Sequence, residues 1–453
     1  MTNHDLARNG RTPERSSAAR RGRSRLGALM AGGLLLITAP VLTGLPAEAQ
    51  TPTPAPPQDG PVALSGVTIH PVTTPVIENG TVLFEDGVIT AMGTDVELPA
   101  GTEILELPGR HVYPGLIDAN SSMGLSEIGG FDVAIDLNEL GDVNPNARAH
   151  VAFNPETRHT TPARSQGVLI TNSSPSGGLI SGLSAAMMLD GWTWEEMTLK
   201  ESTNLMLHWP SPQDEDDYEA ELETLRSTFD EARGYMLALE AEGEALPSDA
   251  RWEAMIPVLQ GEVPIMIQAN ELRQIQDAIT WSEEEEVRIM ILGGRDAAFV
   301  ADHLAGREIP VILSSVQGSP SRGWQPYDEP FTLPLRLHEA GVPFAIAGGS
   351  SAPYTYRLPW EAGTAVAFGL SEEEALRAVT LHPARFLGID DRVGSLGEGM
   401  DATLLVTTGS PLEYETQIEG IYIQGRAVEM DDIHRLFYQK YRQRIEGASD
   451  LER

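Results

Sequence analysis

The sequence predicts an α/β protein: a TIM-like (β/α)8 barrel plus a small composite β-sandwich domain made from both ends of the chain. Seven short apolar runs lie between residues 112 and 347, and helical patterns separate several of them. Continuous apolar runs are expected when both faces of a parallel strand are buried. A doubly wound sheet is the weaker alternative, because no Gly-rich phosphate-binding fingerprint follows an early strand.

Residues 1–49 are predicted to be an export signal peptide. Seven arginines precede the apolar run Leu26–Leu45, and Ala47-Glu48-Ala49 places small residues before a cleavage point at Gln50. An uncleaved anchor is the alternative, since about 20 apolar residues span a bilayer. Cleavage is favoured because Pro40 interrupts the apolar run, Pro46 ends it, and a small-residue site follows. We therefore expect a periplasmic protein with no stable membrane anchor, exported by either the general or the twin-arginine route.

The composition restricts the classes of partner. The 453 residues carry a net charge of −35. Without residues 1–49, the remainder has 24 Lys and Arg against 63 Asp and Glu, a net charge of −39. Such a surface repels nucleic acid and anionic membranes, so we expect neither as a partner. Cysteine is absent, which excludes disulfides, thiolate metal sites and a cysteine nucleophile.

The ends of the ordered chain are predicted to build one small β domain. Residues 50–61 are rich in Pro and Thr and are expected to form an extended, solvated linker. Short β-branched runs punctuated by Gly follow in residues 62–110, including an Asp86-Gly87 hairpin turn. Residues 392–431 repeat this pattern. Since about 50 residues bury too little core alone, we expect the two segments to form a composite β-sandwich.

Residues 111–391 are predicted to form the barrel, with one strand too irregular to place. The seven expected strands are 112–118, 167–172, 205–208, 263–268, 287–292, 309–314 and 342–347, and helices are expected over 296–304 and 372–380. Residues 214–243 form an acidic helical insertion with one apolar stripe. A last helix in residues 432–453 presents an apolar face, and we expect this face to dock on the body. That face holds Leu436, Phe437, Tyr441 and Ile445.

Two blocks of sequence resemble a known family. The first runs from Asn79 to Gly93 and then through Tyr113-Pro114-Gly115-Leu116-Ile117-Asp118-Ala119; the second comprises 376–388 and 394–404. Both are similar to the imidazolonepropionase-like branch of the amidohydrolase superfamily, over roughly residues 62–431. The resemblance implies a barrel with a composite β-sandwich, hydrolysis of non-peptide carbon–nitrogen bonds, and one or two divalent metals, typically zinc. It is also compatible with a homodimer.

The metal positions implied by this resemblance lack their usual ligands. The family's paired first-strand histidines correspond to Asn120 and Ser122. The fifth-strand position falls in 267–270, the sixth in 291–294 and the eighth in 345–351, where no His or Asp stands. Neutral amides and hydroxyls are poor zinc ligands. We therefore predict no metal and no cofactor.

Other residues do not replace the missing ligands. His208 follows a predicted strand at the barrel end where active sites are built, but a hydrogen-bonded structural role is favoured because no second His is near in sequence. Lys200 is the only barrel lysine available for a carboxylated-lysine bridge. The Gly- and Ser-rich segment 173–182 is expected to be a tight connection rather than a ligand loop. The acidic run Asp132, Asp136, Glu139 and Asp142 is expected to be a solvated face rather than a calcium site.

Two hypotheses for the function remain. The first is an exported hydrolase with an atypical site, for which no catalytic residue can be named. The second is a non-catalytic protein that binds a small polar molecule at the mouth of the barrel. Amides and hydroxyls can both donate and accept hydrogen bonds to such a ligand. The pocket candidates are Asn120, Ser122, His208, Gln268, Asn270 and Ser350.

Overall fold

The computed structural model describes residues 53–129, 132–213 and 215–451. The predicted signal peptide and the start of the linker lie outside these residues. Residues 51–453 form one compact unit that contains two eight-stranded sheets. In the described part of the chain, no helix is both long and apolar enough to cross a membrane.

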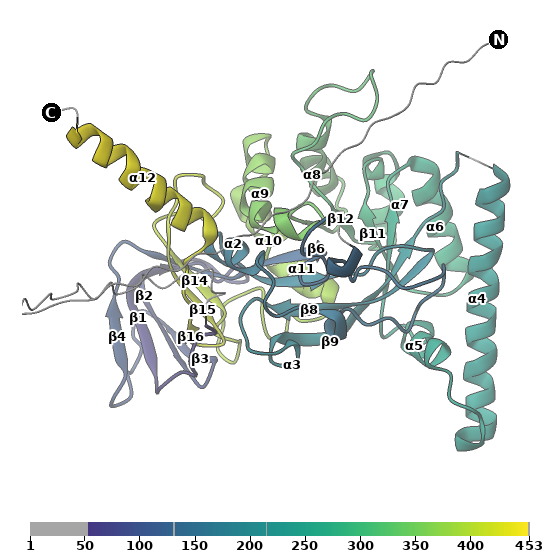
Figure 1. The fold of residues 1–453 in the computed structure, drawn as a ribbon, viewed down its shortest axis with the longest axis horizontal. Coiled ribbons are helices and arrows are strands. Elements are labelled where there is room, and N and C mark those ends of the chain that lie inside the picture. The colour runs from purple at the N-terminus through teal and green to yellow at the C-terminus, as the bar shows by residue number, and fades with distance from the viewer. Residues whose placement is uncertain (1–52, 130–131, 214, 452–453) are drawn as a thin grey trace, which may run out of the picture. The chain divides into compact units, whose positions relative to one another are not determined.

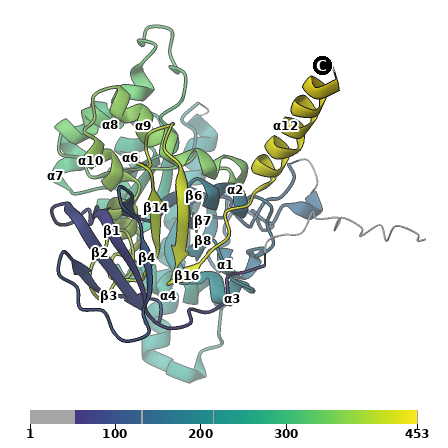
Figure 2. The ribbon, with the colours of Figure 1, turned by 90° about the vertical axis from the view of Figure 1, so that its left-hand side faces the viewer.

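The smaller sheet joins the two ends of the chain, as predicted. Its strands are β1 (Val62–Ile69), β2 (Ile77–Glu85), β3 (Val88–Gly93), β4 (Glu103–Glu106), β5 (His111–Pro114), β14 (Leu404–Thr407), β15 (Ile418–Ile423) and β16 (Arg426–Ala427). The order is β16-β15-β14-β5-β1-β2-β3, with β4 beside β1. Strand β5 pairs parallel with β1 and antiparallel with β14. Purple N-terminal and yellow C-terminal strands therefore lie in one sheet (Figure 2).

The predictions for the first barrel strand and for the linker need correction. The expected strand 112–118 is two strands, because the chain passes from β5 to β6 at Gly115, where an added Cβ would lie 2.7 Å from Leu169. The linker is exposed for most of its length but not free of the body. Ala55 is buried, its N–H donates to Asp190, and the Gln58 amide donates to Phe84 O.

The second sheet is the nearly closed barrel. Its strands are β6 (Leu116–Ser121), β7 (Val168–Ser173), β8 (Ile180–Met188), β9 (Thr198–His208), β10 (Ile265–Ala269), β11 (Ile289–Gly293), β12 (Val311–Leu313) and β13 (Phe344–Ile346), in sequential order. Strand β8 is the one that could not be placed from sequence. It takes up the end of the segment predicted as a loop and runs antiparallel to both neighbours. All other pairings in this sheet are parallel.

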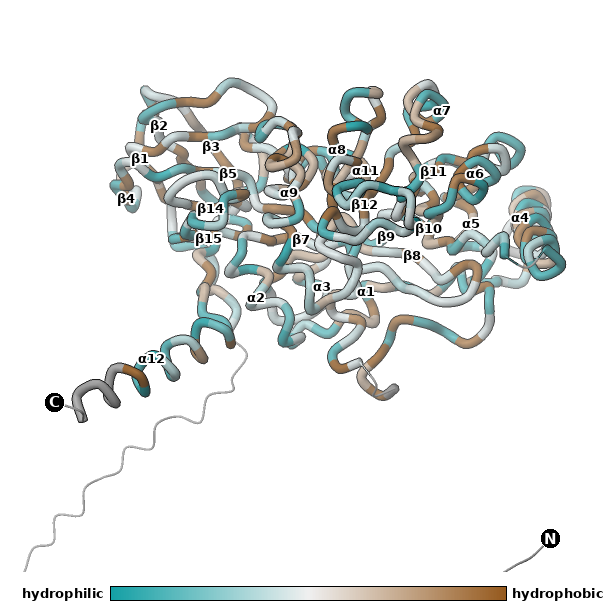
Figure 3. The backbone as a smooth tube through the Cα atoms, turned by 90° about the horizontal axis from the view of Figure 1, so that it is seen from above, coloured by the Kyte–Doolittle hydropathy of each residue, from teal (hydrophilic) through white to brown (hydrophobic). Residues whose placement is uncertain are grey.

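Helices surround the barrel strands (Figure 1). The α-helices are α1 (Ala149–Ala152), α2 (Thr160–Ser165), α3 (Trp194–Met197), α4 (Glu215–Glu242), α5 (Ala250–Leu259), α6 (Leu272–Glu284), α7 (Ala301–Gly306), α8 (Glu329–Glu339), α9 (Leu358–Ala367), α10 (Glu372–Ala378), α11 (Leu381–Leu387) and α12 (Ile433–Leu451); the 3-10 helices are η1 (Asp132–Ala134), η2 (Gly243–Ala245), η3 (Ala297–Val300) and η4 (Ala352–Arg357). Helix α4 is the predicted insertion, and Tyr218, Leu225 and Phe229 on its predicted stripe are buried. Both hydrophilic and hydrophobic residues occur in it (Figure 3).

Helix α12 forms where it was predicted, but the expected docking of its apolar face is wrong. Leu436 and Phe437 remain 47% and 48% exposed, and Ile445 is 72% exposed. The helix lies near α2, and His434 at its start contacts Tyr356. The stripe predicted an amphipathic helix correctly, but it did not specify what would cover the apolar face.

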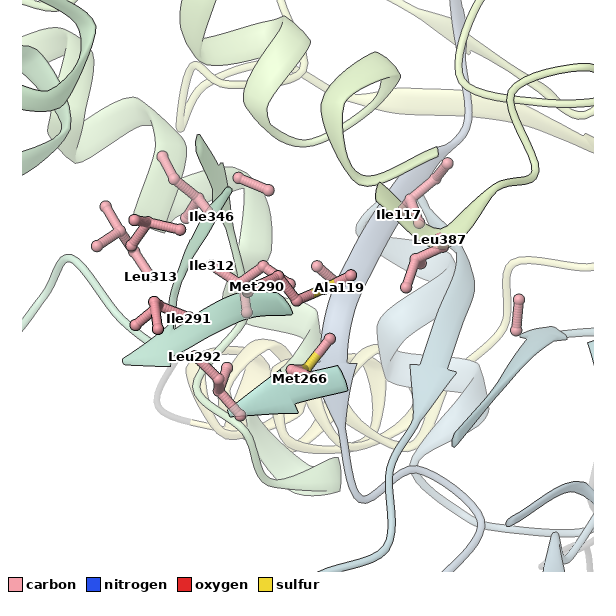
Figure 4. Packing of buried hydrophobic residues seen from close by; sticks show 14 of the residues in the cluster. Ile117, Ala119, Met266, Met290, Ile291, Leu292, Ile312, Leu313, Ile346 and Leu387 are labelled. Carbon is pink, nitrogen blue, oxygen red and sulfur yellow. The ribbon is translucent and has the colours of Figure 1, made fainter. Parts of the chain in front are cut away.

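The barrel core is built from aliphatic and Met side chains of neighbouring strands. Ala119 of β6, Met266 of β10 and Met290 of β11 come together between the strands (Figure 4). These residues are at most 2% exposed. Burial of such side chains is the main driving force for closing the sheet.

Four consecutive turns at the N-terminal face of the barrel share a left-handed residue. Each follows a helix, from α5 to α8, and leads into the next strand. The residue is Gly261 (φ 74°), Glu286 (φ 56°), Glu308 (φ 53°) or Gly341 (φ 73°). Gly adopts this conformation without strain, whereas a residue with a Cβ does not.

Replacing Glu308 or Glu286 with Gly is therefore expected to stabilise the protein, by about 1 kcal/mol each. Gly341→Ala is the matched control, because nothing lies within 4 Å of an added Cβ there and only backbone strain changes. It should cost about 1 kcal/mol. Urea unfolding midpoints measure both effects. A loss of stability in the Glu→Gly variants equal to that in Gly341→Ala would contradict this explanation.

Candidate functional site at the mouth of the barrel

Asn120 and Ser122, which correspond to the family's first-strand metal ligands, lie where β6 meets the end of β13. We call this junction the seam. No strand ladder joins these two strands in the described sheet; hydrogen bonds from β6 side chains close the gap instead. The Asn120 amide donates to Ser350 Oγ at 3.1 Å, and Ala352 N–H donates to Ser122 Oγ at 3.0 Å. Asn120 and Ser122 are only 4% and 7% exposed. Both side chains therefore hold the seam together.

Asp118 takes part in the same seam. Its Oδ1 accepts the N–H groups of Gly348, at 3.1 Å, and Asn120, at 3.3 Å. The side chain is fully buried, and Oδ2 has no hydrogen-bond partner among the described residues. Burial raises the pKa of Asp118 to about 7, although the two N–H groups oppose this rise. The seam thus contains a buried carboxyl group whose pKa is raised well above its usual range.

His208 and Gln268 are the second pair that the structure brings together. They are directly opposite each other in the β9–β10 register. Gly177 N–H donates to His208 Nε2 at 3.4 Å, and burial lowers the pKa of His208 below its ordinary value. The imidazole is therefore neutral at pH 7 and has the predicted structural hydrogen bond. Gln268 is exposed.

The last two pocket candidates, Asn270 and Ser350, lie in different loops. Asn270 is half-buried at the end of β10, where its side chain lies against Gly293 of β11: an added Cβ on Gly293 would meet Asn270 Oδ1 at 2.5 Å. Ser350 has a left-handed backbone (φ 59°) and accepts the Asn120 hydrogen bond. The structure therefore joins Ser350 to Asn120, and His208 to Gln268, and places Asn270 beside β11.

Two buried carboxylates at the mouth were not identified from sequence. Glu361 of α9 is 1% exposed and accepts the N–H groups of Val316, at 2.6 Å, and Gln317, at 2.7 Å. Asp296, also 1% exposed, forms a bidentate pair with Arg322. Burial alone would raise the pKa of Asp296, but the Arg322 hydrogen bonds hold it below its usual range. Both carboxylates fix the loops that follow β11 and β12.

Strands β7, β8 and β9 carry a buried network of polar side chains below the mouth of the barrel. Asn172 Nδ2 donates to Ala119 O at 3.1 Å and to Asn204 Oδ1 at 3.0 Å. Thr203 donates to Asn172 Oδ1, and Asn204 donates to Ser184 Oγ. Buried polar groups that satisfy one another make a rigid core, so these groups serve the barrel structure.

The residues at the mouth do not fit the divalent metal that the resemblance implies. In residues 53–129, 132–213 and 215–451, no group of three His, Asp or Glu side chains could share a metal ion. Lys200 lies at the opposite end of β9, where its ammonium donates to Leu387 O at 2.9 Å and Gly388 O at 3.2 Å. A carboxylated Lys200 would therefore be far from the mouth. Asn120 and Ser122 offer only neutral oxygen atoms: Asn120 Oδ1 has no hydrogen-bond partner among the described residues, and Ser122 Oγ already accepts the N–H of Ala352.

Comparisons with known proteins agree with this fold. A model of the amidohydrolase family matches residues 345–428. The crystal structure of an amidohydrolase from Thermotoga maritima MSB8 is similar, with a TM-score of 0.75, 25% identity, and coverage of 81% of this chain and 99% of that one. An imidazolonepropionase from Paracoccus denitrificans is 24% identical over 375 residues, covering 73% of this chain and 88% of that protein.

Amidohydrolase tasK of Hapsidospora irregularis is 26% identical over 409 residues, or 78% of this chain. The match spans only 40% of that protein's length. Together with the fold and the matching blocks at both ends of the barrel, these similarities show that the chain belongs to the amidohydrolase superfamily. Imidazolonepropionases are among the proteins to which the chain is similar.

Proposed function

We propose that this chain is an exported, metal-independent member of the amidohydrolase superfamily that binds a small polar molecule at the mouth of the barrel. The proposal rests on the two residues at the first-strand metal positions, which close the barrel. Asn120 and Ser122 are buried, and both are bonded to the segment that follows β13. Side chains committed to closing the barrel cannot also turn towards a metal without opening the seam.

The remaining candidates supply the binding groups. Gln268 and Ser350 are exposed, while His208 and Asn270 are half-buried around the same end of the strands. A neutral imidazole, amides and a hydroxyl can both donate and accept hydrogen bonds. The ligand that fits them is a small neutral or zwitterionic molecule with several hydrogen-bonding groups. The strongly acidic surface argues against nucleic acid as a partner.

Metal analysis of the purified mature protein tests this proposal. We expect well below one equivalent of zinc, iron or manganese, because the mouth offers no anionic or imidazole ligand set. We also expect no turnover of cyclic amides, lactams or dipeptides, with or without added zinc or manganese. One or two equivalents of metal, with metal-dependent hydrolysis that disappears in His208→Ala, would overturn the proposal. Asn144→Ala, which removes a half-buried side chain that donates to the loop carbonyl of Gly141, is the control variant.

The second candidate is a hydrolase acting on non-peptide carbon–nitrogen bonds. The similarity to amidohydrolase tasK and to imidazolonepropionase favours it. Such an enzyme would need a general base within reach of substrate. Asp118 has a pKa near 7 but is fully buried, so it cannot contact a substrate in this conformation. Turnover in the substrate panel decides between the two candidates.

Export is part of the proposal and has its own test. N-terminal sequencing of protein recovered from the periplasm should begin at Gln50 if the small-residue site is cleaved. The homodimer remains a prediction, for which the molar mass in solution is the measurement.

A further inference from the structure

A cleft of about 520 Å³ lies at the N-terminal face of the barrel, on the opposite side from the mouth. It opens where β10, β11 and β12 begin and where α6 and α7 end. We call the apolar part of its lining the floor. It comprises residues such as Pro264, Ile289, Met290, Ile309 and Phe386. Exposed charged side chains surround the floor.

The rim carries three arginines and three glutamates, and part of this set is already paired. Arg307 forms an ion pair with Glu283. Arg288 donates to Gly261 O at 3.0 Å but has no carboxylate partner, and Glu286, Glu308 and Arg385 form no ion pair in the part of the chain that the structure describes. The cleft therefore holds free charges of both signs around an apolar floor.

The two free carboxylates stand on strained backbone. Glu286 and Glu308 have the left-handed conformation that the equivalent turns before β10 and β13 give to Gly261 and Gly341. Of these four turns, two have a residue other than Gly at the left-handed position, and these two line the cleft. A residue with a Cβ in this conformation has a strained backbone, which costs free energy. A binding role for the carboxylates explains why the cost falls on these two turns.

We propose that this cleft binds a small zwitterion with an apolar side chain, of the free amino-acid type. Glu286 and Glu308 receive the ammonium group, Arg288 and Arg385 receive the carboxylate, and the apolar side chain packs on the floor. A simple anion would face two free glutamates, and a simple cation two arginines. Only a ligand with both a positive and a negative group pairs with all four charged side chains. The site is separate from the mouth, and the proposal does not depend on the function assigned there.

Calorimetric titration of the full mature protein with L-leucine tests the proposal. L-Leucinamide lacks the carboxylate and 4-methylpentanoate lacks the ammonium group, so each removes one half of the recognition. We expect L-leucine to bind in the millimolar range or tighter, and each half-ligand to bind at least about tenfold more weakly. Absence of L-leucine binding, or equal binding of L-leucine and either half-ligand, would overturn the proposal.

Variants connect the binding to the cleft. Glu308→Gly should weaken L-leucine binding by about tenfold or more while leaving the fold at least as stable, so a loss of binding cannot be attributed to unfolding. Arg385→Gln should weaken it similarly. Glu339→Gln, in the exposed end of α8 outside the cleft, is the matched control and should bind as the parent protein does. Unchanged binding in both cleft variants would show that L-leucine binds elsewhere, and would refute the assignment.

Discussion

Replacing Asp190 with Ala is expected to lower the free energy of unfolding by about 3–5 kcal/mol. Asp190 follows β8 and is 2% exposed. Its carboxylate accepts Arg164 of α2 at 2.8 Å, and it pairs with Arg426 of β16 at 3.0 Å. The same carboxylate accepts the N–H of Ala55 at 3.2 Å. One buried carboxylate thus connects the barrel, the small sheet and the linker.

The cost is large because the variant leaves two guanidinium groups without a counter-charge. The Arg164 side chain is only 5% exposed and that of Arg426 is 17% exposed. Removing one partner from a buried ion pair is far more costly than removing one from a surface pair. Equilibrium unfolding in urea, followed by Trp fluorescence, measures the difference.

Glu419→Ala is the matched control for this experiment. Glu419 pairs with Arg110, but both side chains are more than one-third exposed. Its loss should cost less than about 1 kcal/mol. Equal costs for the two variants would show that Asp190 does not have the structural role assigned to it.

The fold was predictable wherever burial alone determined the sequence pattern. The apolar runs at β10 and β11 need no knowledge of their neighbours, because both faces of each strand are buried. Strand β8 was missed because Ser181, Gly182 and Ser184 interrupt its apolar pattern. A signal was nonetheless present. Only residues 174–179 separate β7 from β8, too short a connection for the crossover that parallel strands require.

The site was predictable only in part, because its contacts come from distant parts of the chain. The sequence indicated that Asn120 and Ser122 cannot be ordinary metal ligands. It did not indicate that Ser350 and Ala352 would bond to them, since those contacts depend on how the loop after β13 turns. Glu361 was missed for the same reason: its partners lie more than forty residues away in the loop after β12.

Asp118→Asn is expected to stabilise the protein at pH 8 and to change its stability little at pH 4. The folded pKa of Asp118 is about 7, against an ordinary value of 3.8. The folded state therefore holds the proton more tightly than the unfolded state, and the parent protein loses stability as the pH rises from about 4 to about 7. Asn resembles the protonated acid and carries no such penalty. Three pKa units set an upper limit of about 4 kcal/mol on the gain.

Urea unfolding of the two proteins between pH 4 and pH 9 measures this effect. The difference in free energy of unfolding should grow up to about pH 7 and remain constant above it. Asp95→Asn, which removes the same charge from an exposed position, controls for the general self-repulsion of this acidic chain and should give no such growth. Parallel curves for Asp118→Asn and the parent protein would contradict the assignment. A growing difference would mean that the carboxyl group closing the seam is present at a cost in stability.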